Sequence, residues 1–204
     1  MTARGAVMQN LAFPQALGEM LTQLRAAHVR YLPGLVSRLR TQVADVLPEG
    51  LVEVNDGRVF GGLQRFDAIA TGPKVHDLQV AVLPNVQHGM SVDVNGTPCA
   101  VIRFPWNECR VQARVDDDRW HYALNAWLTT WLDPEDKNPT DMLGLSSVVH
   151  SVRDVAVADG MLSFTVDFGS APIECVGELI GALVHAGASF VAIGESETLS
   201  RASA

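Results

Sequence analysis

The sequence predicts an α+β protein: a mostly antiparallel sheet built of hairpins, with two helices, at about residues 117–132 and 172–186, packed on one face. Three observations predict this class. Apolar residues alternate with a period of two through much of the chain after Gly50, and elsewhere they recur at helical spacing. Turn-forming pairs such as Asn95-Gly96 separate neighbouring apolar runs, as in hairpins. The order strand, strand, helix occurs twice, which is typical of helices that cover one face of an antiparallel sheet.

The N-terminal region is expected to form a pair of helices. Apolar residues recur at helical spacing from Leu17 to Leu24, and a second stripe runs from Leu35 to Val46. Pro33-Gly34 interrupts the pattern, and proline is best tolerated in the first turn of a helix, where its missing N–H costs little. The sequence therefore predicts a helical arm over residues 1–50, packed on an α+β body over residues 51–204.

The body begins with strands. Hairpins are predicted where turn sequences separate two alternating runs, over residues 51–60, 91–104 and 152–168. Further strands are predicted over residues 75–83, 108–115 and 189–193. In the strand of residues 108–115, Cys109, Val111, Ala113 and Val115 are expected to share one face.

Two helices are predicted within the body. Asp116-Asp117-Asp118 precedes the first, where carboxylates cap free N–H groups, and Pro134 ends it. Its apolar stripe carries three of the four tryptophans: Trp120, Trp127 and Trp131. The second helix has Pro172 in its first turn, after Ser170 or Ala171 as the cap, and Gly187 ends it.

The tryptophans offer two interpretations. Spacing along one helical face indicates that Trp120, Trp127 and Trp131 belong to the core. Trp106 lies in a predicted loop between strands, where a large aromatic side chain is easier to expose. We therefore take Trp106 and Trp120 as candidate contacts for a ligand or a partner.

Charge and composition exclude several classes of protein. The net charge is −8, divided into +2 up to Gly50 (five basic, three acidic residues) and −10 beyond it (ten basic, twenty acidic). Such a body repels phosphate backbones, so nucleic-acid binding is disfavoured. No apolar run is long enough to span a bilayer and no secretory signal precedes the body, so we expect a cytoplasmic protein without a membrane partner. The three cysteines form no C-x-x-C pair and are expected to be buried thiols.

An acidic loop follows the predicted helix at about residues 117–132, and it is the best candidate for a metal site. Asp133, Glu135 and Asp136 face the negative end of the helix dipole, which a hard cation would offset. His150 is a candidate ligand or general base with this loop. The alternatives are a hydrated acidic loop and a hydrogen-bonded structural histidine.

No catalytic or nucleotide-binding motif is present: the chain lacks G-x-S-x-G, H-E-x-x-H, a phosphate loop and G-x-G-x-x-G. The first hypothesis is therefore a non-catalytic protein that acts through protein–protein interaction, including self-association through the N-terminal helices. One alternative is a small-molecule-binding module with a tryptophan-lined pocket. The other is a metal-dependent hydrolase or lyase that uses Asp133, Glu135, Asp136 and His150. No cofactor is expected apart from the divalent cation of this last alternative.

Overall fold

The computed structural model describes residues 15–43, 45–54, 59–71, 77–78, 89–142 and 144–195, and it confirms the α+β class. The described helices are α1 (Gln15–Arg40), α2 (Arg119–Leu132), α3 (Glu174–His185) and the short 3-10 helix η1 (Phe60–Gly62). None of them is long and apolar enough to cross a membrane.

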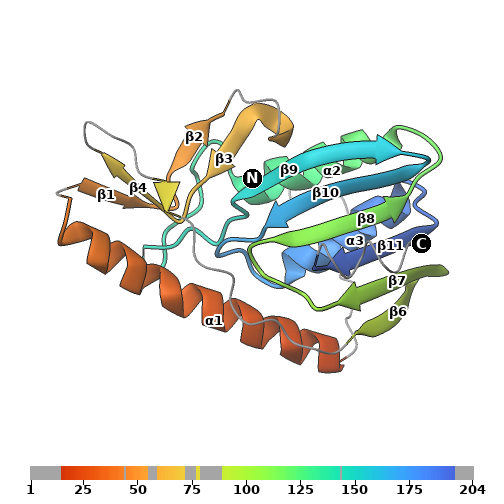
Figure 1. Ribbon diagram of the computed structural model, residues 1–204, viewed down its shortest axis with the longest axis horizontal. Coiled ribbons are helices and arrows are strands. Elements are labelled where there is room, and N and C mark those ends of the chain that lie inside the picture. Colours follow the sequence, from red (N-terminus) through yellow and green to blue (C-terminus); the bar gives the residue numbers. More distant parts are fainter. Residues whose placement is uncertain are drawn as a thin grey trace.

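The main sheet has six described strands, and their order is β6-β7-β11-β8-β10-β9 (Figure 1). Their bounds are β6 (Met90–Val94), β7 (Thr97–Ile102), β8 (Cys109–Arg114), β9 (Ser151–Ala158), β10 (Met161–Asp167) and β11 (Phe190–Gly194). Each neighbouring pair is antiparallel except β7 and β11, which are parallel. The sheet is thus mixed, because β11 follows α3 and enters the sheet between β7 and β8, parallel to the first and antiparallel to the second.

Turn chemistry explains two of the hairpins. Asn95 and Gly96 both have positive φ, 52° and 84°, between β6 and β7. Asp159 and Gly160 likewise have φ of 51° and 73° between β9 and β10. Successive positive φ angles give the turn a twist that matches the flanking strands, and asparagine, aspartate and glycine accept them most readily.

Two small sheets lie beside the main one. One contains β1 (Asp45–Pro48), β4 (Ala68–Thr71) and β5 (Asp77–Leu78), and the other pairs β2 (Leu51–Glu53) with β3 (Leu63–Arg65). The hairpin predicted over residues 51–60 is therefore wrong in its second strand. The strand that pairs with β2 begins at Leu63, directly after the 3-10 segment η1, in which Gly61 and Gly62 have φ of 77° and 72°. The predicted turn Asn55-Asp56-Gly57 and most of the strand at residues 75–83 lie outside the described residues.

The predicted N-terminal helical pair is wrong, since α1 is a single helix with Pro33 inside it. Figure 1 shows it running continuously along one side of the molecule. An interior proline costs a helix about 3 kcal/mol. Apolar residues on both sides of Pro33 offset this cost by burial, because Leu32, Leu35 and Leu39 pack with Leu145 in one cluster. Tertiary packing thus overrides the local signal for a break.

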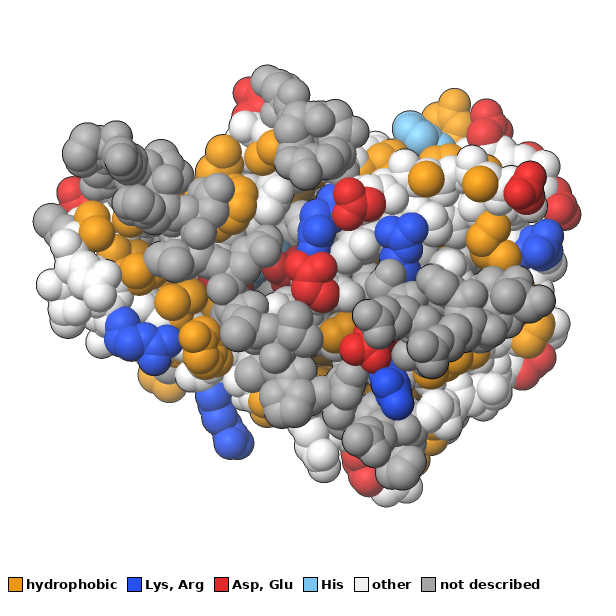
Figure 2. Space-filling model, in the orientation of Figure 1, with side chains coloured by type: hydrophobic (Ala, Val, Ile, Leu, Met, Phe, Trp, Pro, Cys, Tyr) orange, Lys and Arg blue, Asp and Glu red, His pale blue; other side chains and the backbone are white. Residues whose placement is uncertain are grey.

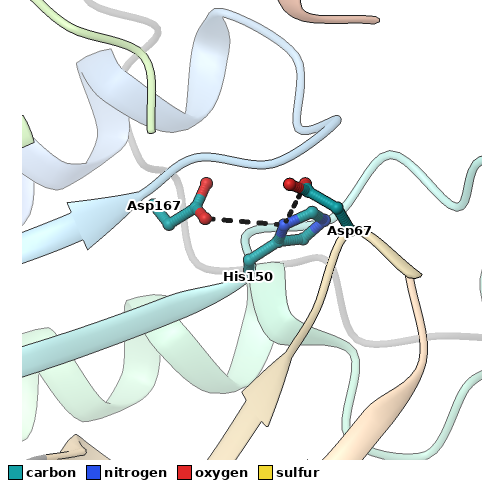
Figure 3. Close-up of side chains that lie close together, drawn as sticks. All are labelled: Asp67, His150 and Asp167. Atoms are coloured by element: carbon teal, nitrogen blue, oxygen red, sulfur yellow. Dashed lines mark ion pairs between the residues drawn. The ribbon is translucent and has the colours of Figure 1, made fainter. Parts of the chain in front are cut away.

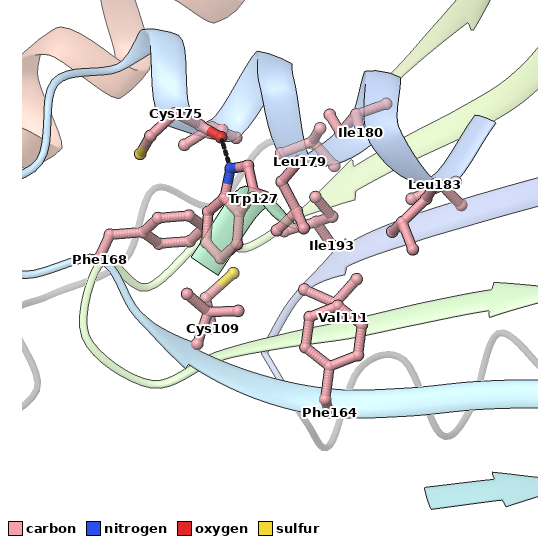
Figure 4. Close-up of a cluster of buried hydrophobic side chains, with 14 of the residues drawn as sticks. Cys109, Val111, Trp127, Phe164, Phe168, Cys175, Leu179, Ile180, Leu183 and Ile193 are labelled. Atoms are coloured by element: carbon pink, nitrogen blue, oxygen red, sulfur yellow. Dashed lines mark hydrogen bonds between the residues drawn. The ribbon is translucent and has the colours of Figure 1, made fainter. Parts of the chain in front are cut away.

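The core lies between the main sheet and helices α2 and α3 (Figure 4). The alternation predicted for residues 108–115 is confirmed, because Cys109, Val111, Ala113 and Val115 are all buried. Trp127 is enclosed between the sheet and α3, and its indole Nε1 donates to the carbonyl of Cys175 at 2.9 Å. This bond satisfies the polar atom of a buried indole and holds α2 against α3.

Candidate functional site

Five titratable side chains from distant parts of the chain are buried together, and we call them the buried ionic cluster. Its members are His28, Glu49, Asp67, His150 and Asp167. None of these residues is more than 4% exposed. Groups of this kind are rarely buried unless they are paired or bind a metal, so the cluster is the strongest candidate for function.

Each member is placed by a different element. His28 lies on the buried face of α1, one turn from the apolar residues on either side of it. Glu49 lies in the turn between β1 and β2, and Asp67 lies between β3 and β4. His150 immediately precedes β9, and Asp167 ends β10. The cluster therefore lies where α1, the two small sheets and the main sheet meet.

Backbone hydrogen bonds hold these segments in register. The His150 N–H donates to the carbonyl of Asp167 at 2.9 Å, and the Arg65 N–H donates to the carbonyl of His150 at 2.7 Å. The Glu49 N–H donates to the carbonyl of Asp67 at 3.2 Å. The side chains consequently converge from backbones that are themselves bonded to one another.

His150 is surrounded by carboxylates on both sides of its ring. Its Nε2 lies 3.0 Å from Glu49 Oε1. Its Nδ1 lies 3.3 Å from Asp67 Oδ1 and 3.7 Å from Asp167 Oδ2. Figure 3 shows the two aspartates approaching this nitrogen from different elements. Nδ1 has no hydrogen bond of good geometry within the described structure, so it faces two carboxylates without donating well to either.

Glu49 is fixed by several partners. Its Oε1 meets His150, and its Oε2 accepts from the backbone N–H of Ser146 at 2.6 Å. Burial alone would raise the pKa of Glu49. Hydrogen bonding and charge from His150, with hydrogen bonds from Ser170 and Ser146, outweigh burial, so the pKa lies below its usual value.

The two histidines of the cluster have opposite shifts. Burial lowers the pKa of His28 below its usual value, although Asp167 and Asp67 oppose that effect. Burial also acts to lower the pKa of His150, but Asp167, Asp67 and Glu49 outweigh it and raise that pKa well above the usual value. At neutral pH and without a metal, His28 is therefore neutral and His150 carries a proton on both nitrogens.

His28 is the member of the buried ionic cluster whose polar atoms are least satisfied by hydrogen bonds. Its Nε2 lies 3.8 Å from Asp67 Oδ1, beyond hydrogen-bonding distance, and its ring centroid lies 6.5 Å from that of His150. Neither of its nitrogens has a hydrogen-bond partner among the residues that the structure describes. An unsatisfied buried polar group is costly, and it calls for an explanation.

The ligand types and distances suit a metal ion. Asp67, His150 and Asp167 each offer one ligand atom, and these atoms lie within 4.8 Å of one another. Ligand atoms about 2.0–2.1 Å from a tetrahedral ion lie about 3.4 Å apart. The separations of 3.3 and 3.7 Å between His150 Nδ1 and the two aspartates are close to that value. Imidazole and carboxylate ligands together are typical of zinc, manganese and iron.

The acidic loop that the sequence suggested as a metal site contacts Arg65 instead. This guanidinium is buried, and it donates to the carbonyls of Leu132, Glu49 and Asp133 at 2.7–2.9 Å. It also pairs with Asp136 at 3.0 Å. A positive side chain thus meets the negative end of the α2 dipole, where the sequence analysis suggested a bound cation.

The other acidic side chains of the loop form their contacts within the loop itself. Asp133 is buried and its Oδ2 accepts from the backbone N–H of Asn138 at 2.7 Å, while Glu135 forms an exposed ion pair with Lys137. The candidate set Asp133, Glu135, Asp136 and His150 is therefore divided. His150 belongs to the buried ionic cluster, and Arg65 connects the loop to that cluster through Glu49.

The structure places the two candidate tryptophans differently. Trp106 is buried, packs on Phe104 and Phe168, and donates from Nε1 to the carbonyl of Gly169 at 2.7 Å. It is a core residue that supports the segment next to Asp167, and it presents no contact surface. Trp120 is partly buried near the start of α2, beside the exposed ring of His121.

Sequence reasoning found only one member of the cluster. Glu49, Asp67 and Asp167 stand beside turns and have no spacing that relates them. The available signal was His28, which falls within the apolar stripe of α1 between Leu24 and Leu32. A histidine at an apolar position of a helix is expected to be buried, and a buried histidine needs polar neighbours.

No protein-family model, curated protein or solved structure significantly matches this chain. The geometry of the site is therefore the basis for any functional proposal.

Proposed function

We propose that this protein binds one divalent transition-metal ion through Asp67, His150 and Asp167. The observation that carries the proposal is the convergence of two buried carboxylates on Nδ1 of a buried imidazole, at distances near those of ligands around one ion. A metal in that position replaces the Nδ1 proton and makes use of a nitrogen that otherwise lacks a good partner.

Glu49 supports this proposal from the opposite side of the ring. Metal-binding histidines commonly donate their other N–H to a carboxylate, which fixes the tautomer and the orientation of the ring. Glu49 Oε1 lies 3.0 Å from His150 Nε2, and Glu49 is itself held by Ser146. With Nδ1 on the ion and Nε2–H on Glu49, His150 is neutral and both of its nitrogens are satisfied.

The charge of the site also favours a cation. Two buried aspartates close together repel each other, and removing carboxylates from water carries a large desolvation cost. A divalent ion balances the charges of Asp67 and Asp167, while neutral His150 adds no charge. The ion and its three ligands together therefore carry no net charge.

Burial of the ligands favours a structural role for the ion. Three protein ligands leave one position of a tetrahedral ion for a further group, but a catalytic site must also admit water or substrate from solvent. Asp67, His150 and Asp167 are each at most 4% exposed. We therefore propose that the ion joins the small sheets to the main sheet, in preference to the hydrolase or lyase considered from the sequence.

The test is metal content and metal affinity. Protein purified without chelators is expected to contain about one zinc, manganese or iron ion per chain, measured by elemental analysis. The double variant D67N/D167N is expected to lose it. E135Q/D136N, which removes charges from the acidic loop, serves as the matched control and is expected to keep it. If wild-type protein neither contains these metals nor binds them after purification, the proposal is wrong.

An exposed aromatic group supports protein–protein interaction as a second proposal. Tyr122 is 75% exposed on α2, and the neighbouring His121 contacts the rings of Phe60 and Trp120 at centroid distances of 5.1 and 5.5 Å. Figure 2 shows histidine and hydrophobic side chains beside acidic ones over this part of the molecule. Exposed aromatic side chains are enriched at interfaces.

Predicted self-association through the N-terminal region also remains a proposal. The apolar stripe of α1 packs within the molecule, so such contacts would use its polar face, which carries Arg30, Arg38 and Arg40. Sedimentation of wild type, Y122S and R30E/R38E separates the two surfaces. Loss of a dimer in one variant identifies its interface, and a monomer at all concentrations contradicts self-association.

A further inference from the structure

His28 is a buried side chain of the ionic cluster that the proposed three-ligand site leaves without a partner. His28 is fully buried, and neither of its ring nitrogens has a hydrogen-bond partner among the described residues. Solvent does not reach these atoms, and an apolar side chain of the same size would avoid the cost of burying them. The position of a histidine there therefore points to a group that the ring binds.

We infer that His28 is the fourth ligand of the proposed metal ion, and that the ion thereby ties α1 to the rest of the protein. This inference rests on the proposed function. Beyond that proposal, the inference names a further ligand and sets the coordination number at four. It also gives the ion a role in fixing the position of α1.

His28 lies next to two of the proposed ligands, Asp67 and His150. Its Nε2 lies 3.8 Å from Asp67 Oδ1, the same carboxylate oxygen that lies 3.3 Å from His150 Nδ1. One aspartate oxygen thus stands between the two imidazoles, and the rings are inclined at 63° with their centroids 6.5 Å apart. His28 lies outside the three residues whose ligand atoms are all within 4.8 Å of one another, so the inference requires its ring to move towards Asp67 when the ion binds.

The resulting ligand set is two imidazoles and two carboxylates. Four protein ligands complete a tetrahedral shell, as in structural zinc sites. Nitrogen ligands disfavour calcium and magnesium, which prefer oxygen, and the set suits zinc, iron and manganese. The four residues come from α1, the β3–β4 connection, the start of β9 and the end of β10, so the ion joins segments that are far apart in sequence.

Other contacts of α1 explain why this ion would matter. Arg25, one turn before His28, donates to the carbonyls of Ala171 and Ser170 at 2.7 and 2.8 Å. Apolar residues near each end of the helix reach two different clusters, one with the main sheet and one with the small sheets. His28 lies between these clusters, where metal binding fixes the middle of the helix.

The experiment compares cobalt and zinc binding in wild type, H28F and H185Q. Phenylalanine keeps the ring volume and removes both nitrogens, while His185 is an exposed histidine on α3 and serves as the control. Wild type and H185Q are expected to give the intense visible spectrum of four-coordinate cobalt. H28F is expected to lose that intensity and to bind zinc at least about 100-fold more weakly.

Two further measurements keep the result interpretable. In cobalt-loaded wild type, two paramagnetically shifted imidazole N–H signals are expected if both histidines bind, and only one if His150 binds alone; this measurement needs no variant. Zinc is expected to slow tryptic cleavage within α1 of wild type and H185Q, and to have no such effect on H28F.

The outcomes separate this inference from the proposal beneath it. One shifted N–H signal, with zinc affinity unchanged in H28F, overturns the role of His28 and leaves a site formed by Asp67, His150 and Asp167. Absence of any zinc or cobalt binding by wild type overturns both.

Discussion

Gly169 shows how closely the backbone approaches the buried ionic cluster. Its φ is +50°, and a Cβ atom placed there would lie 2.2 Å from Cδ2 of His150. Its N–H donates to Asp167 and its carbonyl accepts from Trp106. A glycine is thus needed both for backbone conformation and for the space that the His150 ring occupies.

Gly169→Ala is therefore expected to be strongly destabilising. The left-handed backbone costs about 1–2 kcal/mol for a residue with Cβ, and the overlap with His150 adds about 1–3 kcal/mol. Gly96→Ala is the matched control, because Gly96 also has positive φ but has no atom within 4 Å of the new methyl group. Urea unfolding measures both, and equal losses of stability would contradict the predicted overlap.

The cysteine thiols are expected to be unreactive in the native protein. Burial, together with the charge of Asp93, raises the pKa of Cys99 to about 11. Burial raises the pKa of Cys109 and Cys175 well above the usual value. A raised pKa means less thiolate at pH 8, and thiolate is the reactive species. A thiol reagent is expected to label all three cysteines rapidly in denaturant and slowly in native protein; rapid native labelling would contradict their burial.

At the scale of elements, Arg65 is the side chain that joins the end of α2 to the buried ionic cluster. Helices commonly end with unsatisfied carbonyls, and a cation there also opposes the negative end of the dipole. Arg65 satisfies the carbonyls of Leu132 and Asp133, and the same guanidinium reaches the carbonyl of Glu49.

Arg65→Met is expected to lower the free energy of unfolding by about 3–5 kcal/mol, since it leaves several buried carbonyls without donors. Arg119→Met is the control, because Arg119 is an exposed residue at the start of α2 whose ion pair with Asp117 is open to solvent and contributes little to stability. Hydrogen exchange in α2 is expected to quicken near Leu132 in the first variant alone. If the two variants had similar free energies of unfolding, the hydrogen bonds of Arg65 to these carbonyls would not be important for stability.

Sequence patterns predicted elements where local chemistry decides the outcome. Asn95-Gly96 defines its hairpin, and the tryptophan stripe defines α2, because turn geometry and helical spacing are local properties. The single helix α1 was not predicted, because the break expected at Pro33 is overridden by packing with Leu145, more than a hundred residues away. Burial by a distant segment leaves no mark in the local pattern.

At the scale of the whole molecule, the candidate site arises from topology. Glu49, Asp67 and Asp167 belong to connections and a strand end whose meeting point depends on how three sheets assemble. Their spacing in the sequence carries no information about that assembly. His150 was found because its residue type suits metal binding, and its partners were missed because carboxylates beside turns are also common as exposed turn formers.

Metal binding is expected to raise the stability of the whole protein. A ligand at a hundred times its Kd that binds only the folded state stabilises it by about 2.7 kcal/mol, which corresponds to about 5–11 °C in Tm for a domain of this size. Zinc is expected to produce such a shift in wild type and E135Q/D136N, measured by thermal unfolding. The shift is expected to vanish in D67N/D167N; a shift that persists there would assign the binding to another place.

The central position of β11 bears on how the chain is synthesised. This strand, the last one described, lies between β7 and β8 and bonds to both. A chain that has not yet released β11 from the ribosome lacks the strand that joins β7 to β8, and Val101 and Val111 then lack their neighbour Ile193. Chains that end before Phe190 are expected to leave the described strands of this sheet in two separate parts, β6-β7 and β8-β10-β9.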